Sequence, residues 1–430
     1  MKSGISRRAE QAELRRVHRG RRVRAVGAVV GALTVVTVGL APGATASDEQ
    51  SKQWYLGPMQ AEQMWKVSTG KGVKIAVIDS GVNANTPSLK GQVLTDEVPK
   101  RVAYHATDDY LGHGTTMAEL IAGTGAGGGL KGLAPGAKIV PYRIQLDGLK
   151  GAKEKSQTPE FDLALRAAAD TDVKIINISL GGLIGDEDEA AVKYALSKGK
   201  LLIASVGNDG KNGQVDYPAG YPYVFGVASV DKSLTASNFS SSGGFADVAA
   251  PGEGYPGWCD GTFRSYCDNQ KGTSSATALT SAAAALIWSA HPDWTIYQVE
   301  RALLDTAGRT WPKDNPSKYL GYGVIRPRVV LADKNYDPGP ANVDPLQKQD
   351  GHEWASVAPG APRNSTSPSA SATSQAQQKG STGSTSAAGS SAGSPNGGSS
   401  NTTWIALGAV GAVVVIGGGA WVLARARRTR

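Results

Sequence analysis

Three short segments of this 430-residue sequence carry side chains that together could activate a hydroxyl nucleophile. Asp79 lies in Ile-Asp-Ser-Gly, His113 in Gly-His-Gly-Thr, and Ser274 in Gly-Thr-Ser-Ser-Ala. A serine hydroxyl is unreactive near neutral pH unless a base removes its proton, and an imidazole oriented by a carboxylate is such a base. In the chain order Asp, His, Ser, the three groups therefore indicate acyl transfer by a Ser-His-Asp triad.

The serine and the aspartate each have structural alternatives. Serine is a preferred helix N-cap, so Ser274 alone would more simply begin a helix. Ser275 is a competing hydroxyl, but the pattern Gly-Thr-Ser-x-Ala selects Ser274. Asp79 could form an Asx turn with the residues after it, while Asp108 and Asp109 are alternative carboxylates that do not follow a strand. We favour the triad because all of its segments occur together and in order.

His113 is the expected general base, because imidazole titrates near pH 7 and the flanking glycines allow a substrate to approach closely. Thr115 is expected to cap the helix that follows. Asn208, in Val-Gly-Asn-Asp, carries a side-chain amide that could donate to an oxyanion beside the Ser274 N–H. The alternative for Asn208 is a simple turn.

Apolar runs alternate with helical patterns along the central part of the chain. Strands are expected over 73–78, 137–144, 173–179, 201–206 and 223–230, and helices over 115–122, 161–169, 187–198, 274–288 and 295–306. This alternation predicts an α/β fold with a mostly parallel sheet covered on both faces. Because ligands bind at the carboxyl ends of such strands, we expect Asp79, Ser179 and Gly207 at one edge.

The formal net charge of +8 is concentrated at the two ends of the chain. Residues 1–24 contribute +7 and the last six residues +4, which leaves −3 for the rest. A basic face for nucleic acid is therefore not expected. The Arg-rich start, the apolar stretch after it and Ala-Thr-Ala at 44–46 predict a secretory signal peptide over 1–46. An uncleaved membrane anchor and twin-arginine export are the alternatives.

Residues 404–424 form an uncharged stretch of 21 residues, long enough to cross a bilayer core of about 30 Å. The basic tail 425–430 is expected in the cytoplasm by the positive-inside rule. Residues 336–403, rich in Pro, Ser and Gly, are expected to form a flexible stalk because they cannot bury enough apolar surface to fold. The sequence thus predicts a single-pass protein of the plasma membrane, with the domain 47–335 on the outer side.

Cys259 and Cys267 lie eight positions apart and are expected to form one disulfide in that oxidising compartment. A metal site is the alternative, but it lacks nearby histidine ligands. We expect no cofactor, and the sequence gives no support for a structural calcium ion.

Over roughly residues 54–330 the sequence resembles the subtilisin-like serine proteases. The triad segments and Val-Gly-Asn carry this resemblance, together with Asn-Ile-Ser-Leu-Gly-Gly at 177–182, Tyr-Pro-Ala at 217–219 and Asp-Val-Ala-Ala-Pro-Gly at 247–252. The resemblance implies a three-layer subtilisin-like fold with the catalytic residues Asp79, His113 and Ser274 and the oxyanion donor Asn208. It also implies substrate binding at Ser179, Leu180, Gly181 and Gly207. Ser275 is a departure, since relatives usually carry Met or a larger apolar residue there.

Within that family the sequence is similar to the mycosins, the membrane-anchored proteases of type VII secretion systems. Gln-Trp-Tyr-Leu at 53–56, Ala-Glu-Gln-Met-Trp-Lys at 61–66 and the stalk ending in one apolar span carry this likeness. It implies an endopeptidase whose partners are protein or peptide substrates and the membrane proteins of a secretion complex. The alternative function is a structural subunit of that complex in which catalysis is dispensable.

About 32 residues separate the expected signal cleavage from Asp79. A folded inhibitory pro-domain does not fit into that length. Residues 47–70 are therefore expected to lie against the catalytic domain as an extension that is not removed for activation.

Overall fold

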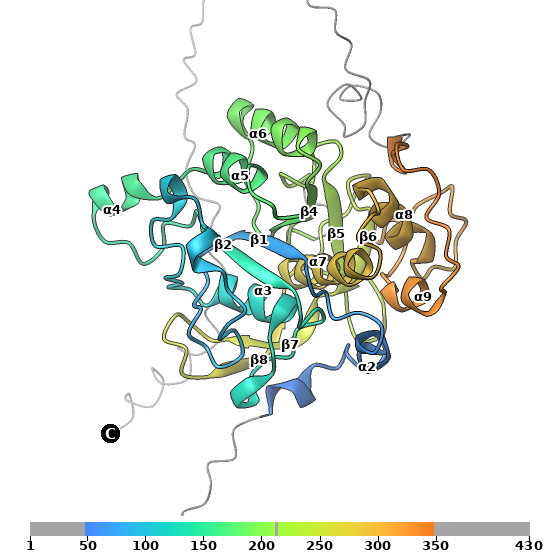
Figure 1. Cartoon of the computed structure of the whole chain (residues 1–430), viewed down its shortest axis with the longest axis horizontal. Helices are drawn as coiled ribbons and strands as arrows, with labels where there is room; N and C mark the ends of the chain where they lie inside the picture. Colours follow the sequence, from blue (N-terminus) through green and yellow to red (C-terminus); the bar gives the residue numbers. More distant parts are fainter. Residues whose placement is uncertain (1–47, 211–213, 348–430) are drawn as a thin grey trace, which may run out of the picture. The chain divides into compact units, whose positions relative to one another are not determined.

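A parallel sheet of six strands organises the part of the chain that the computed structural model describes, residues 48–210 and 214–347. The strands are β1 (Lys74–Asp79), β2 (Lys138–Arg143), β3 (Ile175–Ile178), β4 (Leu201–Ser205), β5 (Phe225–Val230) and β6 (Val248–Pro251). They lie in the order β2-β1-β3-β4-β5-β6 (Figure 1). Strand β1 lies between β2 and β3, where the strand order reverses, and α/β sheets bind ligands at such a position.

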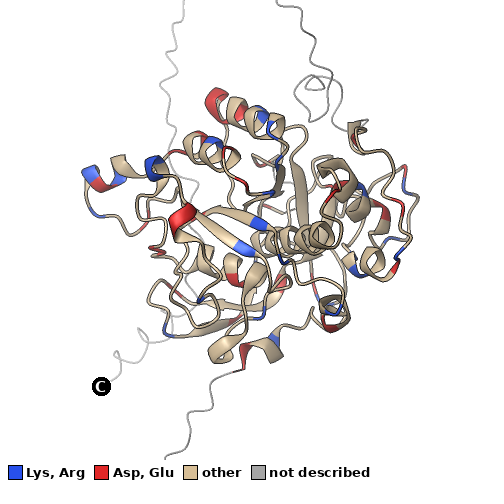
Figure 2. Ribbon diagram, viewed as in Figure 1, with Lys and Arg blue, Asp and Glu red and all other residues tan. Residues whose placement is uncertain are grey.

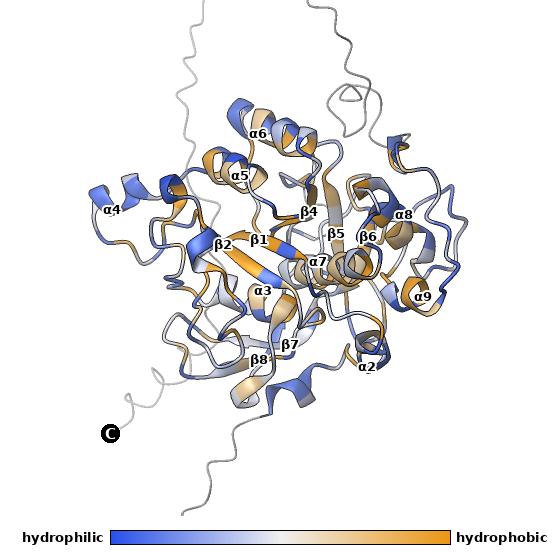
Figure 3. Ribbon diagram, in the orientation of Figure 1, coloured by the Kyte–Doolittle hydropathy of each residue, from blue (hydrophilic) through white to orange (hydrophobic). Residues whose placement is uncertain are grey.

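Both faces of this sheet are buried, because successive residues of a strand point to opposite sides. In β1, Ile75 and Val77 belong to one apolar core, while Ala76 and Ile78 belong to the other. The interior of β1 is accordingly apolar, between hydrophilic ends (Figure 3). The expectation of an α/β fold with a mostly parallel sheet between two helical layers is confirmed.

Helices cover the two faces of the sheet (Figure 1). On one face lie α5 (Phe161–Ala169) and α6 (Asp186–Ser197), and on the other α3 (His113–Ala122), α7 (Thr273–Ala290) and α8 (Ile296–Thr306). Shorter helices are α2 (Ala61–Trp65), α4 (Ala152–Gln157) and α9 (Pro327–Ala332). The alanine-rich α7 is buried over almost its whole length, because small side chains let it approach the sheet closely.

Local sequence explains where two of these helices begin. The first turn of α6 holds four acidic residues, Asp186 to Glu189, which favour the positive end of the helix dipole (Figure 2). Helix α8 begins after Thr295, whose hydroxyl accepts a hydrogen bond from the Gln298 N–H at 3.4 Å. Thr295 is thus the N-cap that the sequence predicts.

A two-stranded antiparallel hairpin, β7 (Glu253–Trp258) and β8 (Tyr266–Lys271), was not expected from the sequence. Gly254, Pro256 and Gly257 interrupt the alternation that would mark β7 as a strand. The expected disulfide between Cys259 and Cys267 is present and closes the loop of this hairpin.

Residues 48–70 lie against the rest of the domain. The Gln53 side chain pairs with the backbone of Lys131, accepting from its N–H at 2.7 Å and donating to its carbonyl at 2.9 Å. The indole of Trp54 donates to the Glu253 carbonyl of the hairpin at 2.9 Å. Tyr55 and Met64 are buried in the core to which α7 also contributes, and helix α2, which carries Met64, contacts α9. The segment therefore contacts the body as the sequence predicts.

The folded region continues past residue 335, into the segment expected to be a stalk. The Arg301 guanidinium of α8 donates to the Pro340 and Val343 carbonyls at 3.0 and 2.7 Å, and Leu346 is buried. Thr295 and Gln298 also donate to this segment, to the Ala341 carbonyl at 2.7 Å and the Gly339 carbonyl at 3.0 Å. Composition does not reveal these contacts, because the side chains that make them belong to α8 and its N-cap.

Within residues 48–210 and 214–347, no helix has the length and apolar character needed to span a membrane. The predicted signal peptide, most of the stalk and the predicted span at 404–424 lie outside the described residues.

Candidate active site

The carboxyl ends of β1 and β3 lie side by side at one edge of the sheet. The strand register pairs Ile78 with Ile178, so Asp79 and Ser179, which follow them, occupy equivalent positions. Neighbouring strands are about 5 Å apart. The topology therefore brings Asp79 next to Ser179, the residue that contacts the start of α7.

Asp79 and His113 are in direct contact. The buried Asp79 Oδ1 accepts hydrogen bonds from His113 Nδ1 and from the Ser80 N–H, both at 2.7 Å. Asp79 Oδ2 has no hydrogen-bond partner among the described residues. Because Nδ1 donates to the carboxylate, Nε2 is the ring nitrogen left to accept a proton, which is the tautomer that a general base needs.

The environment of His113 strengthens it as a base. Burial acts to lower the pKa of the imidazole, but the charge of Asp79 and its hydrogen bond outweigh burial and raise the pKa above the ordinary 6.5. The side chain is 35% exposed, so a substrate can reach the ring.

Asp109 holds the loop that carries His113. One carboxylate oxygen accepts from Ser80 Oγ at 2.9 Å and from the Leu111 and Gly112 N–H groups at 3.0 and 2.8 Å. The other accepts from the Thr115 N–H at 2.9 Å and from the Thr115 hydroxyl at 2.7 Å. This buried carboxylate positions the first turn of α3, a role that sequence reasoning missed.

The start of α3 also differs from the sequence expectation. The helix begins at His113 itself, and Thr115 is not its N-cap. Asp109 and Ser80 Oγ, which accepts from the Gly114 N–H at 2.9 Å, supply the acceptors that an N-cap side chain would otherwise provide. Both acceptors come from outside the helix, so local sequence does not reveal them.

Ser274 is the second residue of α7 and is 8% exposed. Its hydroxyl donates to the Ser179 carbonyl at 3.1 Å, and the Ser179 hydroxyl donates to the Ser274 carbonyl at 3.0 Å. Buried Asn177 extends this network, donating to Ser179 Oγ at 3.0 Å and accepting from Ser281 Oγ at 2.9 Å. The network fixes the start of α7 to the end of β3. Among the hydrogen bonds of the described residues, none joins Ser274 to His113.

Asn208 lies beside the same helical turn. Its Oδ1 accepts from the Thr273 N–H at 2.9 Å and from the Thr273 hydroxyl at 3.0 Å. The amide nitrogen of Asn208 makes no hydrogen bond to the described residues. A side chain whose oxygen is fixed in this way presents its N–H₂ group as a free donor next to the turn that carries Ser274. Ser275, by contrast, turns its hydroxyl back to the Gly272 carbonyl at 3.0 Å.

The segments expected to bind substrate flank this edge. Gly207 accepts a hydrogen bond from the Ser241 N–H at 3.0 Å, while Leu180 and Gly181 continue from Ser179. A cavity of about 470 Å³ opens beside Leu180 and Gly181. Its other lining residues are Ile144, Gln145, Leu146, Asp147, Gly148, Leu149, Lys155 and Leu183. The cavity is large enough to hold side chains of an extended peptide next to the site, and its lining combines leucines with polar groups.

A buried acidic group lies two turns along α3 from His113. Glu119 accepts hydrogen bonds from the Thr86 and Tyr266 hydroxyls, both at 2.7 Å. Burial raises the pKa of Glu119 to about 7, even though these hydrogen bonds act to lower it. The contact joins α3 to β8, and it makes stability depend on pH.

We expect the free energy of unfolding to fall by up to about 3 kcal/mol as the pH rises from 4.5 to above 7. The folded state binds the Glu119 proton more tightly than the unfolded state. The resulting stabilisation is complete below the pKa of Glu119 in the unfolded chain, and it is lost as the pH rises through the higher pKa of the folded protein. Urea unfolding at a series of pH values measures it. Glu119→Gln should flatten the curve, and an unchanged slope in that variant would contradict the assignment.

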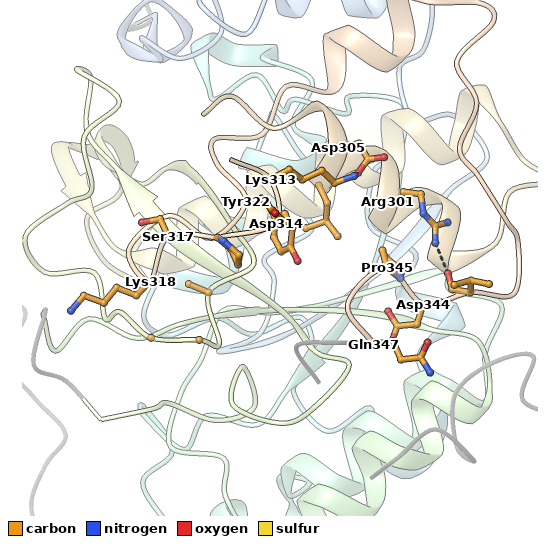
Figure 4. A pocket seen from close by; sticks show the side chains of 16 residues that line it. Arg301, Asp305, Lys313, Asp314, Ser317, Lys318, Tyr322, Asp344, Pro345 and Gln347 are labelled. Carbon is orange, nitrogen blue, oxygen red and sulfur yellow. Dashed lines mark hydrogen bonds and ion pairs between the residues drawn. The ribbon is translucent and has the colours of Figure 1, made fainter. Parts of the chain in front are cut away.

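A second cavity, of about 840 Å³, lies elsewhere in the described part of the chain. Its walls come from α8, the loop around residues 313–318 and residues 343–347, and its charged side chains include Arg301, Asp305 and Lys313 (Figure 4). Lys313 and Asp305 form an ion pair there. None of the candidate site residues lines it, so we do not assign catalysis to it.

Among the described residues, no group of three or more His, Cys, Asp or Glu side chains could hold a metal ion.

Comparisons with known proteins agree with this geometry. Residues 70–323 match the subtilase family, Peptidase S8. Thermitase of Thermoactinomyces vulgaris is 33% identical over 285 residues, 63% of this chain and 95% of thermitase. Subtilisin E of Bacillus subtilis is 36% identical over 265 residues, 60% of this chain and 65% of its own length.

A solved structure is also similar. It is that of the serine protease MycP1, described as an essential component of the type VII (ESX-1) secretion system. It superposes with a TM-score of 0.55 at 28% identity, covering 67% of this chain and 90% of that one. The chain therefore belongs to the subtilase family of serine endopeptidases.

Proposed function

We propose that this protein hydrolyses peptide bonds with Asp79, His113 and Ser274 as its triad. The observation that carries the proposal is the 2.7 Å hydrogen bond from His113 Nδ1 to buried Asp79, at the sheet edge where Ser274 is tied to Ser179. The chemistry needs no cofactor, and we propose none.

The reaction begins with a rotation of the Ser274 side chain. In the free enzyme its hydroxyl donates to the Ser179 carbonyl, and turning about the Cα–Cβ bond directs it to His113 Nε2 when substrate is bound. The imidazole removes the proton as the Oγ attacks the scissile carbonyl, and it gives that proton to the amine that leaves, so an ester to Ser274 remains. Water, deprotonated by the same imidazole, then breaks this ester, and the proton returns to Ser274 Oγ. Asp79 stabilises the imidazolium. The Asn208 amide and the Ser274 N–H stabilise the oxyanion, at the amino end of α7 where the helix dipole favours negative charge.

The composition of the chain ends and the likeness to relatives support a proposal for where the protein acts. We propose a plasma-membrane protein with its catalytic domain on the outer side, joined through the stalk to a span at 404–424, with membrane proteins of a type VII secretion complex as partners. The apolar C-terminal stretch, the disulfide and the likeness to MycP1 support this placement. In spheroplasts, added protease should remove the domain but leave a tag at the C-terminus intact; a protected domain would contradict the topology.

A fluorophosphonate probe tests the catalytic proposal directly. We expect one molecule of probe per protein, and peptide mapping should place it on Ser274. Ser274→Ala should abolish labelling. Ser275→Ala is the matched control, since it removes the neighbouring buried hydroxyl and should still be labelled. Labelling that persists in Ser274→Ala, or that is absent from the wild type, would overturn the proposal.

A further inference from the structure

One carboxylate at the site edge has no part in the triad. Asp216 is half-buried, and its Oδ1 accepts hydrogen bonds from the Gly182 N–H at 2.7 Å and from the Tyr217 N–H at 2.9 Å. The Leu183 N–H donates to the Tyr217 carbonyl at 3.2 Å, which holds the two segments side by side. The carboxylate is thus fixed in place by the backbone.

Two glycines make room for this carboxylate. A Cβ added to Gly181 would lie 1.9 Å from Asp216 Oδ2, and a Cβ added to Gly207 would lie 3.0 Å from the same atom. Oδ2 therefore lies between the segment that follows β3 and the segment that follows β4. These are the segments that contact the start of α7, through Ser179 and Asn208.

The charge of Asp216 is only partly compensated. Both hydrogen bonds go to Oδ1, and Oδ2 accepts none from the described residues. No Lys, Arg or His among those residues forms an ion pair with it. A half-buried carboxylate with a free oxygen attracts a cation strongly, because the low local dielectric favours pairing.

We propose that Asp216 gives the enzyme a preference for a lysine or arginine side chain at the residue whose carbonyl is attacked. The inference rests on the proposed function of Ser274. Gly181 is two residues from Ser179, and two residues of extended chain span at most about 7 Å, so Oδ2 is within reach of a long side chain that begins at the reacting carbonyl. Lysine and arginine combine that length with a positive charge. An acidic side chain at the same position would meet a like charge and is rejected.

The test compares peptides that differ only at the residue before the cleaved bond, carrying Lys, Arg, Leu or Glu with the same fluorogenic leaving group. We expect the wild type to cleave the Lys and Arg peptides best and the Glu peptide worst. Asp216→Asn keeps the size and the Oδ1 acceptor but removes the charge. It should lower kcat/KM for Lys and Arg about 10- to 100-fold, as loss of a hydrogen bond to a charged group does, and leave the Leu peptide nearly unchanged.

Asp209→Asn is the matched control, because it removes the same charge from an exposed position near Asn208 and should keep the preference. Active sites are counted with the fluorophosphonate probe, so a failure of the triad proposal appears as missing label in every variant. If the protein labels normally but Asp216→Asn leaves the Lys-to-Leu ratio unchanged, the specificity inference is wrong while the catalytic proposal stands.

Discussion

Asp79→Asn is expected to lower kcat/KM about 10⁴-fold while the protein stays folded. An asparagine presents either an oxygen or an N–H₂ group to His113 Nδ1, and the latter forces the ring into the tautomer whose Nε2 carries hydrogen. That nitrogen then cannot take the Ser274 proton. Kinetics on a fluorogenic peptide, with circular dichroism to check the fold, measure the effect.

The same substitution should move the acidic limb of the pH profile. In the wild type Asp79 raises the pKa of His113 above 6.5, so the neutral, catalytically useful imidazole appears only as the pH rises through that elevated value. Without the carboxylate, burial dominates and the pKa falls, so the residual activity of Asp79→Asn should rise at lower pH. A loss below tenfold with an unmoved limb would mean that Asp79 does not orient this histidine.

Asp109→Ala is expected to destabilise the protein by roughly 3–5 kcal/mol and to reduce turnover in the fraction that remains folded. The substitution leaves three backbone N–H groups without acceptors, at Leu111 and Gly112 before His113 and at Thr115 in the first turn of α3. Urea denaturation gives the stability, and the amplitude of fluorophosphonate labelling gives the competent fraction.

Asp108→Ala is the matched control for this prediction. Asp108 is the adjacent carboxylate, but its side chain is 47% exposed and, among the described residues, pairs only with His105 on the surface. We expect a change within about 0.5 kcal/mol, since surface ion pairs contribute little. Equal effects at the two positions would show that the loop does not depend on buried Asp109.

Local pattern predicted the sheet and most helices because their apolar periodicity is strong. The expected range 161–169 equals α5. Asp79 is the last residue of β1, and Ser179 and Gly207 come after the ends of β3 and β4. The hairpin β7–β8 could not be predicted, because its glycines and proline remove the alternation and its pairing depends on contacts with α3 and the N-terminal segment.

Some residues of the candidate site could likewise be identified from the sequence, while others could be found only from the fold. Residue types and their order were enough to nominate Asp79, His113 and Ser274. Its position at the end of a strand set Asp79 apart from Asp109, and the hydrogen bond to His113 agrees with that choice. The structural role of Asp109 could not be predicted, because its bonds to Ser80 and Thr115 depend on the fold. Asp216 could not be identified from the sequence, because its position between Gly181 and Gly207 depends on segments far apart in the chain.

The contacts of residues 48–70 make this segment part of the folded domain. Detaching this segment would break its bonds to the Lys131 and Glu253 backbones and bring Tyr55 and Met64 into water. Removing residues 48–70 is therefore expected to destabilise the catalytic domain, because hydrogen bonds would be lost and buried side chains exposed.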